Sequence, residues 1–209
     1  MGTDIHYKFQ KKGKEKDCEW VDVDLPTDEW GDYDSPFYIN RSYLLFSVLA
    51  GVRNGVGFAG CYRHEPIVPI SEPRGLPEDV ETQSCFDEYE DEIWFFGEHS
   101  QSWLLSSEIL EYLKKGVEIS HQGVISLSNY LEWSGLEEPR DYCGDVFGSG
   151  ISIYDGTENI LPMSEVDNYS HVRVQWMMSV NENLDYFRAM IQSLQDSFGE
   201  VRMVFGFDS

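Results

Sequence analysis

The C-terminal segment carries the pattern that most restricts how this chain can fold. In residues 171–180, apolar and polar side chains alternate, as they do in a strand with one buried face. An amphipathic helix follows, which begins at Asn181 or Asn183, ends at Gly199 and repeats its apolar residues every three to four positions. Residues 201–207 then alternate again. This strand–helix–strand unit favours a sheet with helices packed against it.

Two regions near the N-terminus add strands and a helix. Residues 3–9 alternate, a turn follows, and residues 18–23 return as a second strand, which predicts a hairpin. The segment 43–52 is apolar nearly all round, so we expect a helix in the core. Asn40 or Ser42 would cap its N-terminus, because both side chains accept hydrogen bonds from free helical N–H groups.

The whole pattern predicts an α+β fold, with a mixed, mainly antiparallel sheet and a few helices packed on it. We expect a single domain over residues 1–209, with a long Pro/Gly-rich loop at about 54–92. Long connections of this kind are uncommon in compact domains and often carry function. Shorter elements are expected in the middle of the chain: a helix at 108–115 capped by Ser106 or Ser107, a helix at 127–133, and a strand at 150–154.

The charge of the chain excludes some classes of partner. Acidic residues number 38 and basic residues 15, which gives a formal net charge of −23. Direct nucleic-acid binding is not expected, because it needs Lys and Arg to neutralise phosphates. The sequence shows no secretory signal and no apolar run near the roughly 20 residues that span a bilayer. We therefore expect no membrane association and a cytoplasmic location in a bacterial host.

The candidates for a shared active site are two short polar clusters: Asp4 with His6, and the segment His99-Ser100-Gln101-Ser102-Trp103. Asp4 and His6 are two positions apart in a strand, so their side chains point to the same face. That spacing suits two ligands of one metal, or a carboxylate that orients an imidazole, although an ordinary polar face of an edge strand is the more common reason for it. His99 could be a third ligand or a general base. We predict Asp4, His6 and His99 as catalytic residues and as the ligands of a divalent metal, if the protein uses a cofactor.

Basic residues are scarce, yet several arginines surround the predicted core helix and the Pro/Gly-rich loop. Arg41, Arg53, Arg63 and Arg74 lie there, and a local positive pocket would suit a phosphate or carboxylate ligand. Pairing with the abundant acids is the alternative for each. The predicted ligand-binding residues are Arg41, Arg53, Arg74, Ser100, Ser102 and Trp103.

The chain begins Met1-Gly2-Thr3-Asp4-Ile5-His6, and further short motifs follow through its first half. Together they resemble a family of poorly characterised phage, prophage and bacterial proteins, which begin with a Met-Gly-Cys-Asp-Ile-His-like stretch in which Cys is common where this chain has Thr3. The resemblance implies a phage-type accessory protein without implying a mechanism. It continues through these segments: Leu49-Ala50-Gly51-Val52-Arg53-Asn54, Gly57-Phe58-Ala59-Gly60, Glu72-Pro73-Arg74-Gly75-Leu76-Pro77 and His99-Ser100-Gln101-Ser102-Trp103-Leu104.

Three hypotheses for function follow from these features. The first is a phage-type accessory protein, with counter-defence as one role, that binds a small anionic, nucleotide-like ligand in a His/Asp/Arg cleft; Trp103 could stack on a base. The second is a metal-dependent hydrolase that uses Asp4, His6 and His99. The third is an acidic nucleic-acid mimic that inhibits a basic host protein through segments 15–34 and 78–92. Whether the protein catalyses a reaction, and in which oligomeric state it works, stays open.

Overall fold

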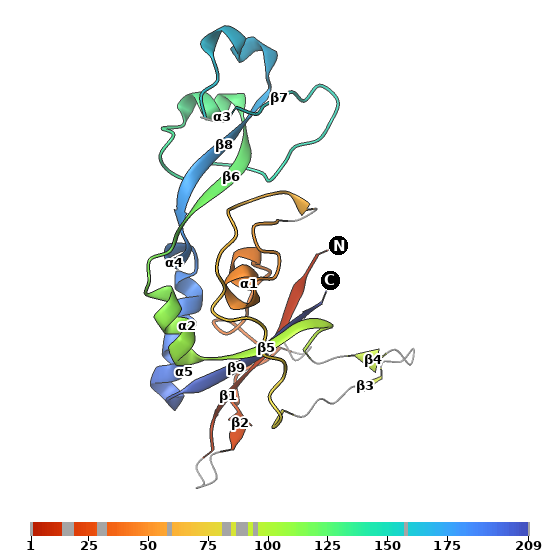
Figure 1. Ribbon diagram of the computed structural model, residues 1–209, viewed down its shortest axis with the longest axis vertical. Helices are drawn as coiled ribbons and strands as arrows, with labels where there is room; N and C mark the ends of the chain where they lie inside the picture. The colour runs from red at the N-terminus through yellow and green to blue at the C-terminus, as the bar shows by residue number, and fades with distance from the viewer. Residues whose placement is uncertain are drawn as a thin grey trace.

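Four antiparallel strands form the main sheet, in the order β2-β1-β9-β5 (Figure 1). Every residue of β9 from Val201 to Phe207 is buried, as expected for a strand with neighbours on both edges and cover on both faces. The four strands are β1 (Asp4–Lys12), β2 (Trp20–Asp22), β5 (His99–Leu105) and β9 (Val201–Asp208). The computed structural model describes residues 2–13, 19–28, 33–57, 60–80, 85–86, 92–93, 96–156 and 159–208.

A second sheet projects from the body of the molecule as an arm, which we define as residues 118–179 (Figure 1). It contains β6 (Glu118–Ser126), β7 (Ile153–Tyr154) and β8 (His171–Ser179), with β8 in the middle. β6 pairs antiparallel with β8 along its whole length, and β7 pairs parallel with it at His171 and Val172. The arm also carries α3 (Leu127–Glu132) and the 3₁₀ helix η2 (Met163–Asn168).

The chain returns from the arm to the body through two helices, α4 (Val180–Asn183) and α5 (Asp185–Phe198), before it enters β9. The predicted C-terminal strand–helix–strand unit is therefore confirmed, and so is the α+β class. Its two strands belong to different sheets, so the unit joins the arm to the main sheet. The predicted caps Asn181 and Asn183 were wrong, because both residues lie inside α4, and the Ser179 side chain accepts the capping bond from Glu182 N.

The apolar helix predicted after Asn40 or Ser42 is α1 (Tyr43–Ala50), and Ser42 caps it by accepting a bond of 3.3 Å from Leu45 N. Residues Leu45–Ala50 are all buried, which confirms the expected core helix. Gly51 ends the helix with φ of 68°, a conformation that glycine adopts without a steric penalty. The helix predicted at 108–115 is α2 (Ser106–Leu113).

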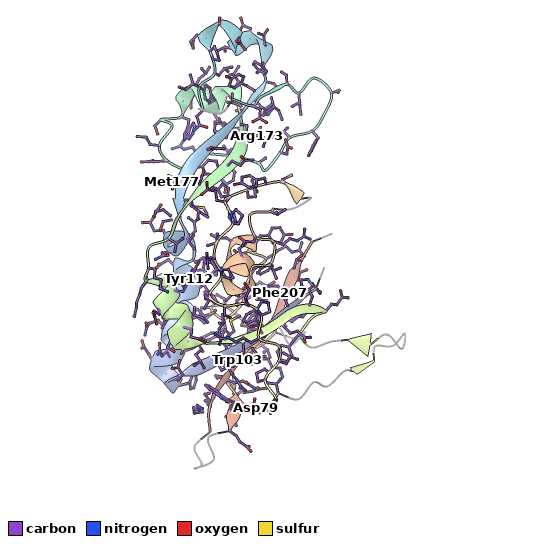
Figure 2. All side chains as sticks on the ribbon, viewed as in Figure 1. Asp79, Trp103, Tyr112, Arg173, Met177 and Phe207 are labelled. Atoms are coloured by element: carbon purple, nitrogen blue, oxygen red, sulfur yellow. The ribbon has the colours of Figure 1, made fainter. Side chains whose placement is uncertain are left out.

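Apolar side chains from both sheets and the helices form one continuous core. The ring of Phe207 on β9 contacts the ring of Phe46 on α1, with centroids 5.1 Å apart, and Figure 2 shows Phe207 beside this helix. Between α1 and the short pair β3 (Cys85–Phe86) and β4 (Glu92–Ile93), the described residues form isolated bridges instead of a sheet. No helix in the described part of the chain is long and apolar enough to cross a membrane.

Candidate functional site

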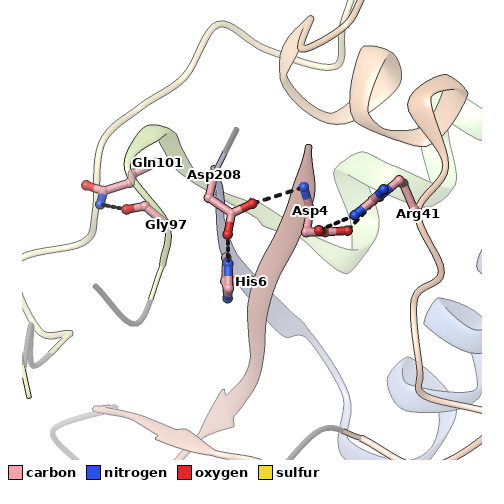
Figure 3. Close-up of polar contacts among 6 residues, drawn as sticks. All are labelled: Asp4, His6, Arg41, Gly97, Gln101 and Asp208. Atoms are coloured by element: carbon pink, nitrogen blue, oxygen red, sulfur yellow. Dashed lines mark hydrogen bonds and ion pairs between the residues drawn. The ribbon is translucent and has the colours of Figure 1, made fainter. Parts of the chain in front are cut away.

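Asp4 and His6 lie on one face at the N-terminal end of β1, and both side chains contact charged neighbours (Figure 3). Arg41 forms an ion pair with Asp4, and its Nε donates to Asp4 Oδ1 at 2.7 Å. The Asp208 carboxylate joins the two residues: it accepts from Asp4 N at 3.1 Å and lies 2.9 Å from His6 Nε2. Burial alone would raise the pKa of Asp208, but the bonds from His6 and the Asp4 amide hold it below its usual range.

His99 does not join this group. Directly paired strand residues share a face, and His99 pairs with Phe207, whereas His6 pairs with the neighbouring Gly206. Successive residues of β9 point to opposite faces, so His99 lies on the other side of the sheet from His6. Its ring stacks on Phe207 at 6.1 Å between centroids, and its Nδ1 lies 3.0 Å from Ser100 Oγ. The predicted convergence of Asp4, His6 and His99 on one metal is therefore wrong.

Within the described residues, no three His, Cys, Asp or Glu side chains are grouped so that they could hold a metal ion.

The other predicted ligand-binding residues hold a loop against β5. Arg74 donates to both carboxylate oxygens of Glu108, at 3.0 and 2.6 Å, and its guanidinium stacks over the Trp103 ring at 4.8 Å. The Arg74 amide donates to Ser102 Oγ at 3.1 Å, and Ser102 is 1% exposed. Glu108 keeps a lowered pKa, chiefly because of the bond from Arg74. These contacts give Arg74, Ser102 and Trp103 a structural role that their sequence pattern does not distinguish from ligand binding.

Arg53 likewise has a protein partner, because its Nε donates to Thr3 Oγ1 at 2.8 Å. The structure thus brings Asp4, His6 and Arg41 together through Asp208, and leaves His99, Arg53 and Arg74 elsewhere. The acidic segments proposed for nucleic-acid mimicry are described only in part: the structure describes 19–28 and 33–34 of segment 15–34, and 78–80, 85–86 and 92 of segment 78–92.

A different cavity lies where the arm meets the body, and we call it the junction pocket. Its volume is about 320 Å³. One side is the N-terminus of α1, with Tyr43 and Leu44. Arg63 and His64 line it from the connection after α1, and His121 of β6 lines it from the arm, together with Tyr142.

Backbone pairing places these residues side by side. His64 forms an isolated antiparallel bridge with His121, and Gln122 N donates to the Arg63 carbonyl at 2.6 Å. On the other side of the bridge, Glu65 N donates to the Ser120 carbonyl at 3.1 Å. Residues 63–65 therefore extend the arm's sheet at the free edge of β6, and this pairing fixes the position of Arg63 and His64 at the mouth of the arm.

The Arg63 side chain occupies a slot between two glycines. A Cβ added to Gly57 would lie 2.8 Å from Arg63 Cγ, and one added to Gly144 would lie 3.1 Å from Arg63 Cζ. The guanidinium lies over the ring of Tyr142, 5.4 Å from its centroid. Its Nη1 is buried and has no hydrogen-bond partner. The slot therefore holds the Arg63 guanidinium in place, but it offers no hydrogen-bond acceptor to Nη1.

No carboxylate within the described residues forms an ion pair with Arg63. By contrast, the buried Arg202 has Asp79 at 3.0 Å and Gln10 at 2.7 Å. An unpaired buried donor costs about 1–3 kcal/mol, and more when it is charged. The following arginines all pair with an acidic side chain: Arg41, Arg74, Arg173, Arg188 and Arg202.

The two histidines of the junction pocket are buried and neutral at neutral pH. His64 is 3% exposed and His121 is 7% exposed, and their rings stack with centroids 6.1 Å apart. Burial, and then the nearby Arg63 charge, lowers the pKa of His121 to about 4. Burial likewise lowers the pKa of His64, whose Nδ1 lies 2.8 Å from the Glu65 carbonyl and donates to it in the neutral form. His121 Nδ1 is buried without a partner.

Among the residues that the structure describes, no acidic side chain lines the junction pocket. Two other surface hollows do contain carboxylates: one has Glu111 and Asp196, and the other has Glu132, Glu137 and Glu138. In a chain with 38 acidic residues, the described lining of this pocket contributes one arginine and no carboxylate, and Glu138 hydrogen-bonds to Tyr142 from outside the lining. Such a site attracts anions, and the two neutral imidazoles can add hydrogen bonds without adding charge.

His64 and His121 were missed by sequence reasoning. Each is a single histidine without a neighbouring metal-ligand or catalytic pattern, and the strand that carries His121 was not predicted. The usable signal was the pair Arg63-His64 in the Pro/Gly-rich segment of a chain with only five histidines. Comparison with known protein families, curated proteins and solved structures finds no match for this chain. The family resemblance in its first half stays a prediction.

Proposed function

We propose that this protein binds a small anionic ligand in the junction pocket. The observation that carries the proposal is Arg63: it lines a cavity without acidic residues, and its buried Nη1 has no partner. A ligand with a phosphate or carboxylate group would supply an acceptor for the Arg63 guanidinium. Charge-assisted hydrogen bonds to guanidinium are shorter and about twice as strong as neutral ones.

The shape of the pocket supports a bound small molecule. Its volume of about 320 Å³ lies at the lower end of the roughly 300–1,000 Å³ of ligand sites. Such sites are mostly apolar with a few placed polar groups, and this one combines Leu44, Val56 and Met178 with the polar side chains described above.

The first hypothesis from the sequence was a small anionic ligand in a His/Asp/Arg cleft. We keep this class of ligand but propose the junction pocket as its binding site. Of the predicted cleft, Asp4, His6 and Arg41 are paired with protein neighbours, whereas the junction pocket has unpaired groups. If the protein is a phage-type accessory protein, we propose that it sequesters a small host metabolite or signal. That role rests on the family resemblance alone, and ligand binding does not depend on it.

Calorimetric titration of the full chain with inorganic phosphate and with small phosphorylated and carboxylated compounds tests the proposal. We expect at least one of them to bind, and Arg63→Gln to weaken its binding. Arg188→Gln is the matched control, because it removes the same charge from an exposed arginine that pairs with Asp185 on its own helix. Equal affinity of the two variants for every anion would overturn the proposal.

A further inference from the structure

The N-terminus of α1 opens into the junction pocket. Tyr43 and Leu44 are its first helical residues, and both line the cavity. The first N–H groups of a helix have no intrahelical acceptor, and the helix dipole places partial positive charge there. Ser42 satisfies the amides of Leu45 and Phe46, through its side chain and its carbonyl respectively. Anionic groups bind at such helix ends, and here Arg63 lines the same cavity.

A second observation also indicates a ligand. His121 is 7% exposed, lines the cavity, and leaves Nδ1 without a hydrogen-bond partner. The hydroxyl of Tyr43 is buried and unpartnered as well. Native proteins satisfy most of their buried polar atoms, so two such atoms in one pocket call for an explanation. A ligand with hydrogen-bonding groups on its edge would provide it.

The arm side of the cavity is built from aromatic rings that are held in place by one another. The Trp176 ring lies behind it, 4.6 Å from the His121 ring and 4.8 Å from the Tyr142 ring between centroids. The His121 and Tyr142 rings meet edge to face at 5.6 Å. Such a fixed aromatic wall suits a flat, aromatic ligand, because stacking of one base on an aromatic side chain is worth about 1–3 kcal/mol.

From these features we infer that the ligand is a mononucleotide, with its phosphate between Arg63 and the N-terminus of α1 and its base against the wall of Tyr142 and His121. This inference rests on the proposed function and names its ligand class. One guanidinium and one helix end match one phosphate group. The cavity of about 320 Å³ has room for one nucleotide and is small for two.

Calorimetric titration of the full chain with AMP, GMP, CMP and UMP tests the inference. The comparison ligands are adenosine, inorganic phosphate, glycerol 3-phosphate and benzoate. We expect at least one mononucleotide to bind at least tenfold more tightly than every comparison ligand. Arg63→Gln should weaken that mononucleotide at least tenfold, and Arg188→Gln should leave it unchanged.

A second variant tests the stacking wall. Tyr142→Leu removes an aromatic face and also the ring that lies under the Arg63 guanidinium, so it should weaken the mononucleotide at least tenfold more than it weakens inorganic phosphate. Circular dichroism shows that the variant is folded. Tyr154→Leu is the control, since that ring packs on Tyr169 of the arm and does not line the pocket.

The outcomes separate this inference from the proposed function. If glycerol 3-phosphate, benzoate or free phosphate binds as tightly as any mononucleotide and depends on Arg63, the nucleotide inference is overturned and anion binding stands. If Tyr142→Leu weakens phosphate and mononucleotide equally, the stacking wall is wrong. If no compound binds, or if binding is indifferent to Arg63→Gln, both the inference and the proposed function fail.

Discussion

Arg63→Gln should weaken ligand binding strongly and change the stability of the protein little. The reason is that Arg63 is a charged, partly buried side chain that forms no ion pair with the described residues. Its guanidinium gains a cation–π contact with Tyr142 at 5.4 Å, worth about 0.5–2 kcal/mol. Against this gain, its buried Nη1 lacks a partner, at a cost of about 1–3 kcal/mol. The two effects nearly cancel, so we expect the free energy of unfolding to change by less than about 1 kcal/mol.

The same substitution should have a large effect on ligand binding. Hydrogen bonds to a charged group contribute about 1.5–3 kcal/mol, which corresponds to a rise in Kd of roughly 10- to 150-fold. The Arg63 charge also helps to lower the pKa of His121 to about 4, so its removal should raise that pKa. Urea denaturation, calorimetric titration and an NMR titration of the His121 imidazole measure the three effects separately.

A structural role for Arg63 would give the reverse pattern. If Arg63→Gln lowered the free energy of unfolding by more than about 2 kcal/mol and left the affinity for anions unchanged, the reasoning would be refuted. Arg188→Gln controls for the change in net charge, because its ion pair with Asp185 is exposed and contributes less than about 1 kcal/mol.

Three further predictions concern the fold. Phe207→Ala should destabilise the protein by about 3–5 kcal/mol in urea denaturation, because the ring is fully buried against Phe46; a loss below 1 kcal/mol would contradict the described core. Stability should fall as the pH drops from 6.5 toward 4, since His121 takes up a proton near 6.5 when unfolded and only near 4 when folded; His121→Phe should flatten this part of the pH profile, and an unchanged slope would count against the buried neutral imidazole. A double-mutant cycle on Arg74 and Glu108 should give a coupling of about 1 kcal/mol that is lost as the pH falls through the lowered pKa of Glu108, and zero coupling at pH 7 would refute the bidentate pair.

The elements that could be predicted from the sequence are those whose pattern is set by burial on one face. β8 and α5 have long, regular apolar repeats, and both are present. β6 was missed because two of its inward positions hold His121 and Gly123, which interrupt the expected apolar alternation. A glycine is required at that point, since a Cβ there would lie 2.8 Å from the Tyr142 ring. The lining of the junction pocket thus disturbs the pattern of the strand that contributes to it.

The candidate site was harder to predict because it depends on contacts between distant parts of the chain. Asp4 and His6 share a face, as their spacing predicts, but the register of β5 against β9 puts His99 on the other face. A strand has a side-chain period of two, so a single residue of register decides between convergence and separation. The pairing of residues 63–65 with β6 also leaves no local signal, and it alone brings His64 beside His121.

The five histidines allow one measurement that tests anion binding in the junction pocket directly. Two of them, His64 and His121, belong to the pocket, and His6, His99 and His171 lie elsewhere with partners Asp208, Ser100 and Ser170. With histidine-selective isotope labelling, titration of the full chain with the anion that binds most tightly in calorimetry should shift the imidazole resonances of His64 and His121 and leave the other three in place. Shifts at His6 or His99, with His64 and His121 unmoved, would contradict the account and return the site to the end of β1.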